Sequence, residues 1–290
     1  MVSKEKKGGS KRASEAALEA AVRKLEDAER LPEGLRDRVN RLLAKPHDKT
    51  ELIEKLKLHE QYSDRIKTLS SYGFIDESGR PKEGDVPPPS LEEALAVFTP
   101  ETLALAATFQ GPTLLLVPKT SFASKVKAIN DHKIMYSHMK NYKGVMQEDC
   151  SLDSLFKESD QGSARITGWQ ALIVDGAKEM VLKEGLDDED LTFYQRVELR
   201  KSARKPGEKG FDRHTYAMLM MESLKKGDPI DKAAYERGGT FTLLDDDPSW
   251  KDRAAPNAYW NWSTRCVRFR HFGNGPGSDA RLRSSVGGDI

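Results

Sequence analysis

Residues 252–290 read DRAAPNAYWNWSTRCVRFRHFGNGPGSDARLRSSVGGDI, and their composition differs from that of the preceding chain. They include no Lys, Glu, Gln or Met, whereas all 8 Met of the protein lie upstream. Strand propensity accounts for a shortage of Lys and Glu, but not for the loss of Gln and Met. The segment is rich in Asn, Tyr, Ser, Arg, Phe and Gly, which combine adaptable polar contacts with rigid aromatic area. We therefore expect short strands that present a recognition surface.

Strand alternation predicts which side chains of this segment face outward, because successive residues of a strand point to opposite faces. If Trp260 and Trp262 pack inward, their neighbours are exposed. On the next strand Val267 and Phe269 are expected in the core, and Cys266 on the exposed face. The predicted ligand-binding residues are Asn257, Tyr259, Asn261, Ser263, Thr264, Arg268, Arg270, His271 and Asn274. The alternative is that these are ordinary solvent-facing strand residues.

The upstream sequence indicates an α+β fold. Short apolar or alternating runs predict strands at 112–117, 164–174, 240–244, 258–262, 265–272 and 280–286. Helical periodicity and caps predict helices from Ser90, near 101–109, and at 121–130, 191–204 and 213–226. The polar residues 132–162 are predicted to form a long loop. A strand, two helices and then a crowded set of short strands is an α+β order rather than repeated βαβ winding.

Composition shifts divide the chain into predicted segments. These are a flexible basic tail (1–13), a small helical module (14–86), a linker with a short helix (87–104) and the main domain (105–290). In the module, apolar stripes predict helices at 14–30, after Pro32, and from a cap at Thr50 to Leu69. The module either tethers or oligomerises the protein, or reads DNA as a winged helix. Mixed Lys, Glu and Asp on the third helix favour the first interpretation.

The sequence offers no strong candidate for catalysis or metal binding. It has no phosphate loop, no Gly-x-Ser-x-Gly elbow and no His-Glu-x-x-His pair. The acidic run 245–247 is the best metal candidate, but it lacks the alternating ligands and closing Glu of a calcium loop, so we interpret it as a solvated turn. His214 is interpreted as structural or as a helix cap. No catalytic residue, metal or cofactor is expected.

Charge and hydropathy narrow the expected partners. A net charge of +1, from 47 basic and 46 acidic residues, gives no global attraction to nucleic acid or acidic lipid. No apolar run approaches the roughly 20 residues that span a bilayer. Residues 1–12 are basic and lack the apolar core of an export signal. We expect no membrane span, no nucleic-acid partner, and by default a cytoplasmic location.

The C-terminal part resembles a known family. The stretch TFTLLDDDPSW from Thr240, followed by AAPNAYWNWSTRCVRFRHFGNGPGSDARLRSSVGGD, is similar to the variable region of proteins diversified by retroelements. In that family, adenines of a template RNA are copied randomly, so that Asn codons scatter into a set without Lys, Glu, Gln, Met or Trp. The residues missing from 252–290 match that exclusion. Under the resemblance, Trp260, Trp262 and residues 283–286 are fixed scaffold.

The resemblance implies a C-type lectin fold for residues 105–290, with a variable region at about 254–283. ITGWQALIVDGA resembles its first strand, and 191–204 and 213–226 resemble its two helices. The implied function is non-enzymatic display of a hypervariable face that binds an unknown protein or cell-surface ligand, with homo-oligomerisation through the N-terminal helices left open. Two alternatives remain: a DNA-binding regulator, and an oxidase resembling formylglycine-generating enzymes, which needs a copper-binding cysteine pair that we do not expect.

Overall fold

The computed structural model describes residues 48–76, 79–80, 86–131, 135–142, 145–147, 168–178, 191–234, 238–245, 255–261, 265–272 and 280–290. The chain divides between His47 and Asp48, and all described residues belong to the second part. The predicted basic tail, the helix at 14–30 and the helix after Pro32 lie outside the described residues.

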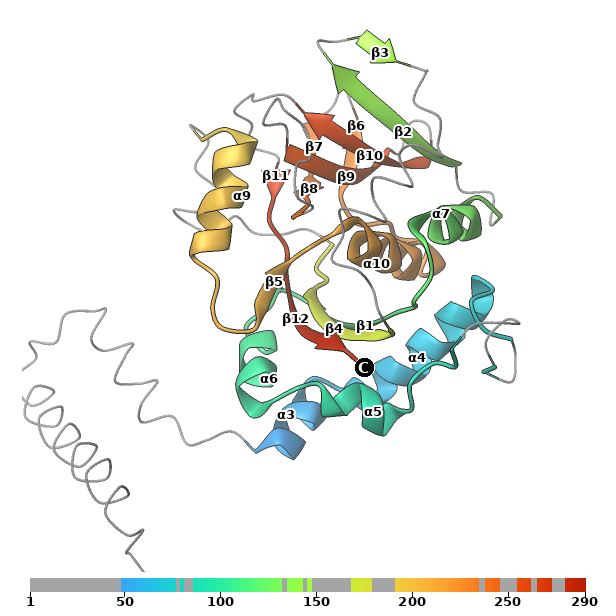
Figure 1. Cartoon of the computed structure of the whole chain (residues 1–290), viewed down its shortest axis with the longest axis vertical. Helices are drawn as coiled ribbons and strands as arrows, with labels where there is room; N and C mark the ends of the chain where they lie inside the picture. The colour runs from blue at the N-terminus through green and yellow to red at the C-terminus, as the bar shows by residue number, and fades with distance from the viewer. Residues whose placement is uncertain are drawn as a thin grey trace, which may run out of the picture. The chain divides into compact units, whose positions relative to one another are not determined.

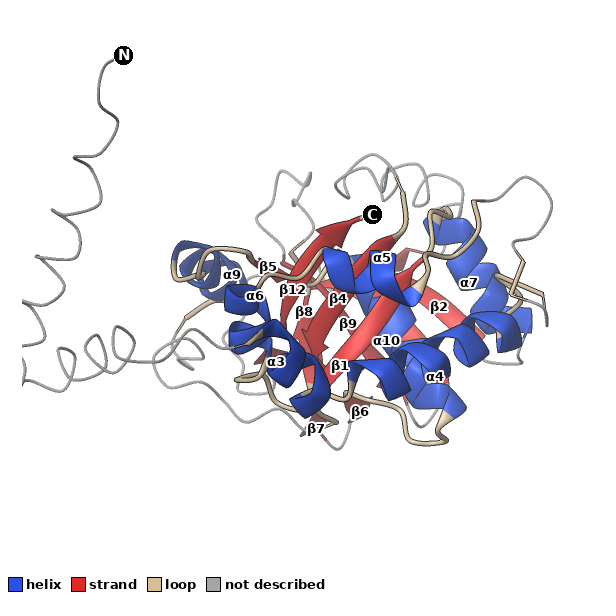
Figure 2. Cartoon of the chain, turned by 90° about the horizontal axis from the view of Figure 1, so that it is seen from below, coloured by secondary structure: helices blue, strands red, loops and turns tan. Residues whose placement is uncertain are grey.

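The described residues form alternating layers of helices and sheets (Figures 1 and 2). On one side of a small sheet lie α3 (Lys49–Lys55), α4 (Leu58–Ser71), α5 (Leu91–Ala96) and α6 (Pro100–Ala106). The sheet's antiparallel strands run in the order β1 (Pro112–Val117), β4 (Gln170–Asp175), β12 (Ser284–Asp289) and β5 (Glu208–Gly210). The terminal strand β12 is therefore held between two earlier strands.

A larger sheet carries the compositionally unusual segment. Its main path is β11 (Ala280–Arg281), β8 (Phe241–Leu243), β9 (Ala255–Asn261), β10 (Cys266–Phe272), β2 (Met135–Tyr142) and β3 (Val145–Gln147). A side branch, β6 (Lys232–Ala234), pairs with β9 and with β7 (Gly238–Gly239). Strand β10 is antiparallel to β9 and parallel to β2. Two strands of the unusual segment, β9 and β10, thus occupy the middle of this sheet, while β11 lies at its edge and β12 belongs to the small sheet.

Helix α10 (Arg213–Lys225) lies between the two sheets, beside α7 (Phe122–Asp131) (Figure 1). Every residue from Arg213 to Ser223 is buried, so the helix has no solvent-facing stripe. The helix is therefore a core element, although Arg213, His214 and Glu222 are among its buried residues. The ring of Tyr216 meets that of Phe269 edge-on at 5.7 Å, which joins α10 to the larger sheet.

The predicted helix from Thr50 to Leu69 is wrong as a single element, because the chain forms α3 and α4 with a break at Lys57. Lys57 adopts the left-handed conformation with a φ of 54°, which interrupts a right-handed helix. The break lets Leu56 and Leu58 both reach the core. The cap also differs: Asp48 accepts a hydrogen bond from the Thr50 backbone N–H at 2.8 Å.

The predicted boundary at residue 86 does not separate two domains. Leu58 and Leu69 of α4 lie in the same buried cluster as Val174 of β4 and Phe269 of β10. The following linker is also fixed to this unit, since Tyr62 donates to the Pro89 carbonyl at 2.7 Å. Helices α3 and α4 are therefore part of one core with both sheets, and not of a separate helical module.

Two further predictions change. The polar stretch 132–162, predicted as a loop, contains β2 and β3, because pairing with β10 supplies a strand partner despite the polar sequence. The predicted strand 280–286 is two strands, β11 and β12, with Leu282 and Arg283 between them. Other predictions are confirmed: Ser90 and Glu93 form a reciprocal capping box, and helices together with one antiparallel and one mixed sheet make an α+β fold.

Candidate functional site

The predicted recognition strands are neighbours in the structure. Strand β10 pairs with β9 so that Arg270 lies opposite Asn257, Arg268 opposite Tyr259, and Cys266 opposite Asn261. Directly opposite residues of an antiparallel pair share a face of the sheet. The register therefore brings predicted site residues of both strands onto one face, as strand alternation predicts. Trp260, Val267 and Phe269 are buried, which confirms their predicted place in the core.

The exposure predicted for β9 is wrong. The exposed fractions of Asn257, Tyr259 and Asn261 are 0%, 4% and 4%, so these three side chains do not face solvent. The reason is that both faces of β9 are covered. Residue Leu243 of β8 lies opposite Asn257 and therefore on the same face. Leu243 packs in a small cluster with Phe193 and Val197 of α9 (Phe193–Ser202).

The remaining predicted site residues divide into two groups. Arg268 is among the described residues and is partly buried. Arg265, three residues earlier and not among the predicted site residues, is exposed. The backbones of Arg270 and His271 belong to β10, but their side chains lie outside the description. Ser263, Thr264 and Asn274, with Trp262, lie outside the described residues altogether. Of the described predicted positions, Arg268 is thus the one that retains access to solvent.

A buried polar network fixes the end of the chain beneath these strands. Arg283 forms an ion pair with Asp231 at 2.7 Å, and both side chains have an exposed fraction of 0%. Thr242 links the pair, because its hydroxyl donates to Asp231 at 2.6 Å and accepts from Arg283 Nε at 2.9 Å. Arg283 Nη1 also donates to the carbonyls of Asp175 and Ala177, each at 2.8 Å. The segment before β12 is therefore tied to both sheets.

The Asp175 carboxylate completes this attachment. It accepts hydrogen bonds from the backbone N–H groups of Gln110 at 2.9 Å and Ser284 at 3.0 Å. Nearby, Arg200 of α9 pairs with Glu208 of β5, and the Ser284 hydroxyl donates to Glu208 at 2.6 Å. Residues that the resemblance assigns to fixed scaffold, Arg283 and Ser284, are therefore bound through buried charged groups. Sequence reasoning gave no signal for their partners.

The arginine face of α9 is defined as Arg196 and Arg200 of the helix together with Arg204, two residues after its end. Arg200 and Arg204 border a small pocket with room for about one water molecule. The pocket lies between α9, β5 and β8, and its lining includes Arg200, Arg204 and Asp245. Asp245 pairs with Arg204 at 2.7 Å. Burial raises the pKa of the Asp245 carboxyl, and the guanidinium of Arg204 opposes that rise.

The interpretation of the acidic run as a solvated turn is therefore wrong for Asp245. Its side chain is only 20% exposed, because it folds back onto Arg204 and its backbone N–H donates to the Phe211 carbonyl. Asp246 and Asp247 lie outside the described residues. His214 is buried against the ring of Phe122, at 5.7 Å between centroids, which fits the predicted structural role; the cap of α10 is Asp212.

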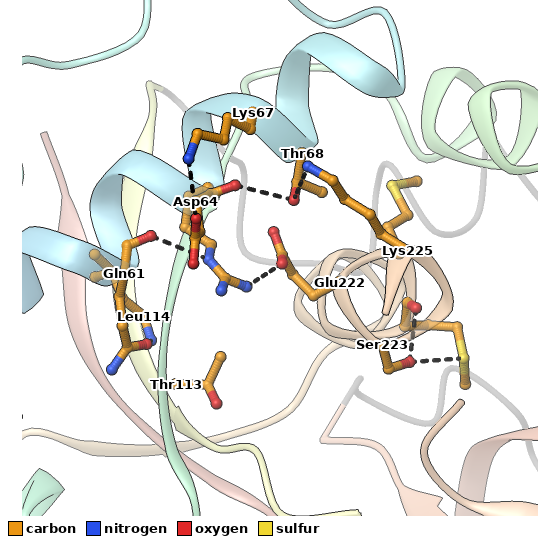
Figure 3. A network of polar contacts seen from close by, with 12 residues as sticks. Gln61, Asp64, Lys67, Thr68, Thr113, Leu114, Glu222, Ser223 and Lys225 are labelled. Carbon is orange, nitrogen blue, oxygen red and sulfur yellow. Dashed lines mark hydrogen bonds and ion pairs between the residues drawn. The ribbon is translucent and has the colours of Figure 1, made fainter. Parts of the chain in front are cut away.

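A second buried polar contact joins α4 to α10 (Figure 3). Glu222 points from α10 toward α4 and forms an ion pair with Arg65. Beside it, Lys225 donates to the Thr68 hydroxyl at 3.2 Å and Tyr72 donates to the Met221 carbonyl at 3.2 Å. Burial raises the pKa of Glu222, while Arg65 lowers it; burial and the Glu222 charge raise the pKa of Tyr72 to about 12.

Within the described ranges, no group of three or more His, Cys, Asp or Glu side chains is arranged to hold a metal ion. Among the described helices, none has both the length and the apolar character of a membrane span. No family model, curated protein or solved structure matches this chain.

Proposed function

We propose that this protein is a non-enzymatic display protein that binds ligands through a C-terminal surface diversified by a retroelement. The observation that carries the proposal is compositional: residues 252–290 lack Lys, Glu, Gln and Met while retaining six arginines and several aromatic residues. Such a pattern is expected where Asn codons are rewritten by adenine-specific copying. The proposed scaffold for this surface is the C-type lectin fold.

The anchoring of the C-terminal strands supports this proposal. Val267 and Phe269 are 0% and 3% exposed, and β12 is held by the Arg283–Asp231 pair. A substitution at a surface residue away from such packing usually changes the free energy of unfolding by no more than about ±0.5 kcal/mol. Exposed positions between the anchors are therefore free to change without loss of the fold.

Burial shifts the proposed binding surface from β9 toward β10. Asn257, Tyr259 and Asn261 are enclosed, so we propose Arg265 and Arg268 as its described members. Ser263, Thr264, Arg270, His271 and Asn274 remain predicted members. Arginine is enriched among residues that dominate binding energies, because its planar fork makes several directed hydrogen bonds.

A display library tests this proposal. Arg265 and Arg268 are randomised together in the full chain, and the matched control library randomises Val267 and Phe269. We expect most members of the first library to resist proteolysis, and selection on immobilised proteins to yield specific binders. The control library should be largely degraded. A first library that unfolds as often as the control, or that yields no binder to any target, would contradict the proposal.

A further inference from the structure

Two arginines of α9, Arg196 and Arg200, share one side of the helix, and Arg204 follows two residues after its end. Arg196 and Arg200 are four residues apart within the helix, a spacing that places their side chains one above the other about 5–6 Å apart. Arg200 pairs with Glu208, and Arg204 pairs with Asp245. Arg196 is different, because no described residue accepts a hydrogen bond from its Nε, Nη1 or Nη2. Among the described residues, the arginine face thus holds one more positive charge than its acidic partners balance.

The unpaired guanidinium lies fully inside the protein. Arg196 has an exposed fraction of 0%, so water does not replace the missing acceptors at the surface. Its Cζ lies 5.9 Å from the centre of the Phe193 ring, a cation–π distance. Such a contact offsets only part of the cost of burying a charge, which is normally met by a paired and hydrogen-bonded anion. A role in packing alone would be served better by Leu or Met.

The small pocket at the C-terminal end of α9 contains a second unused donor, although Arg196 itself does not line it. Val197 and Arg200, which follow Arg196 along α9, both line the pocket. Arg204 also lines it, and its Nε is buried with no hydrogen-bond acceptor among the described residues. The side chains of Arg204 and Asp245 are 19% and 20% exposed, so this end of the arginine face reaches the surface. Donors without acceptors therefore occur at both ends of the arginine face.

We propose that the arginine face of α9 binds one anionic oxygen group of a ligand, a carboxylate or a phosphate, with Arg196 as its principal charge. The planar guanidinium presents paired N–H donors that match both groups. The bound anion supplies the acceptors that the described residues do not give to Arg196. Since Arg196 is fully enclosed, binding requires the contacts around Val197 and Asp245 to open. This proposal stands independently of the diversified surface on β10.

Titration of the full chain with inorganic phosphate, and separately with acetate, tests the proposal and distinguishes the two anions. We expect saturable binding of at least one of them by calorimetry. Arg196→Met should weaken the Kd at least tenfold, and Arg196→Lys should weaken it less because the charge is kept. Arg80→Gln is the matched control, since Arg80 is exposed and distant in sequence, and it should leave the Kd unchanged.

Thermal unfolding supplies a second measurement that does not depend on affinity alone. In chloride buffer, Arg196→Met should unfold at the same temperature as the wild type or at a higher one, because an unpaired buried charge is removed. The anion should raise the wild-type Tm and leave that of Arg196→Met unchanged. The proposal is overturned if neither anion binds the wild type, if Arg196→Met binds as tightly as the wild type, or if it unfolds several degrees lower in chloride.

Discussion

Replacing Arg283 by Met should strongly destabilise the protein, because Arg283 holds the terminal strand to both sheets. Methionine replaces the unbranched aliphatic part of the arginine side chain but lacks the guanidinium. It leaves Asp231 buried with an exposed fraction of 0% and without its ion-pair partner. It also removes the donors to Thr242 and to the carbonyls of Asp175 and Ala177.

The magnitude follows from the burial of the pair. Removing one member of a buried ion pair costs about 3–5 kcal/mol, because the other charge stays in the interior without compensation. Typical domains unfold with only about 5–15 kcal/mol, so this loss is a large fraction of the total. The pair as a whole contributes less than this, since replacing both partners also removes the stranded charge.

Urea unfolding followed by circular dichroism measures this loss directly. The set comprises the wild type, Arg283→Met, Asp231→Leu and the double variant, with Arg80→Met as the exposed control expected to change stability by less than about 0.5 kcal/mol. We expect the double variant to be more stable than the sum of the two single losses predicts. A loss below about 1 kcal/mol for Arg283→Met, or strict additivity, would refute this assignment of the network.

Four further substitutions, one of them a control, probe other parts of the frame. Gly287→Ala should lower the free energy of unfolding by about 2–5 kcal/mol, because Gly287 has a φ of 119° and the added Cβ would lie 2.1 Å from the Ala171 carbonyl oxygen. The control Gly79→Ala should cost only about 1–2 kcal/mol, because Gly79 has a φ of 78° but open space around it. Equal losses of the two variants in urea unfolding would contradict this reasoning. Gln61→Met should lower the free energy of unfolding by about 1–3 kcal/mol and speed hydrogen exchange at the Leu114 amide. The reason is that the Gln61 side chain accepts a hydrogen bond from that amide at 2.7 Å and donates one to the Pro112 carbonyl at 3.3 Å. Unchanged exchange at Leu114 would count against this contact. The pKa of Glu222 is raised in the folded state, so its protonated form stabilises the fold, and this stabilisation is lost as the pH rises above the ordinary carboxyl value. The free energy of unfolding of the wild type should therefore fall relative to that of Glu222→Gln as the pH rises through that window. A difference that stays flat or increases with pH would contradict the assignment.

Sequence periodicity predicted the relative orientation of residues within a strand, but not whether a face is covered. Val267 and Phe269 were placed correctly because alternation fixes which residues share a face. The same alternation grouped Asn257 and Tyr259 correctly, yet their burial depends on the cover that begins with Phe193 and Val197, more than fifty residues earlier. Such long-range cover leaves no mark in the local pattern.

Buried charged residues were the other feature that the sequence did not reveal. In the sequence, Arg196 and Arg283 cannot be told apart from exposed arginines, because their burial depends on how α9 and β12 pack. The same holds for Asp245, whose carboxylate turns toward Arg204 rather than toward solvent. Local patterns predicted the structure correctly where all partners are close in sequence, as in the Ser90–Glu93 capping box. They failed at Lys57, where the helix breaks so that Leu56 and Leu58 can both be buried in the core.

The most direct test of the central proposal is deep sequencing of the codons for residues 240–290 from many sibling cells of one lineage. The account predicts substitutions concentrated between about 254 and 283, at codons whose template carries adenine. The codons for Trp260, Val267, Phe269 and Arg283 should stay constant, since these side chains are buried in the frame. A sequence that is identical in all siblings, or that varies evenly along the chain, would contradict diversification.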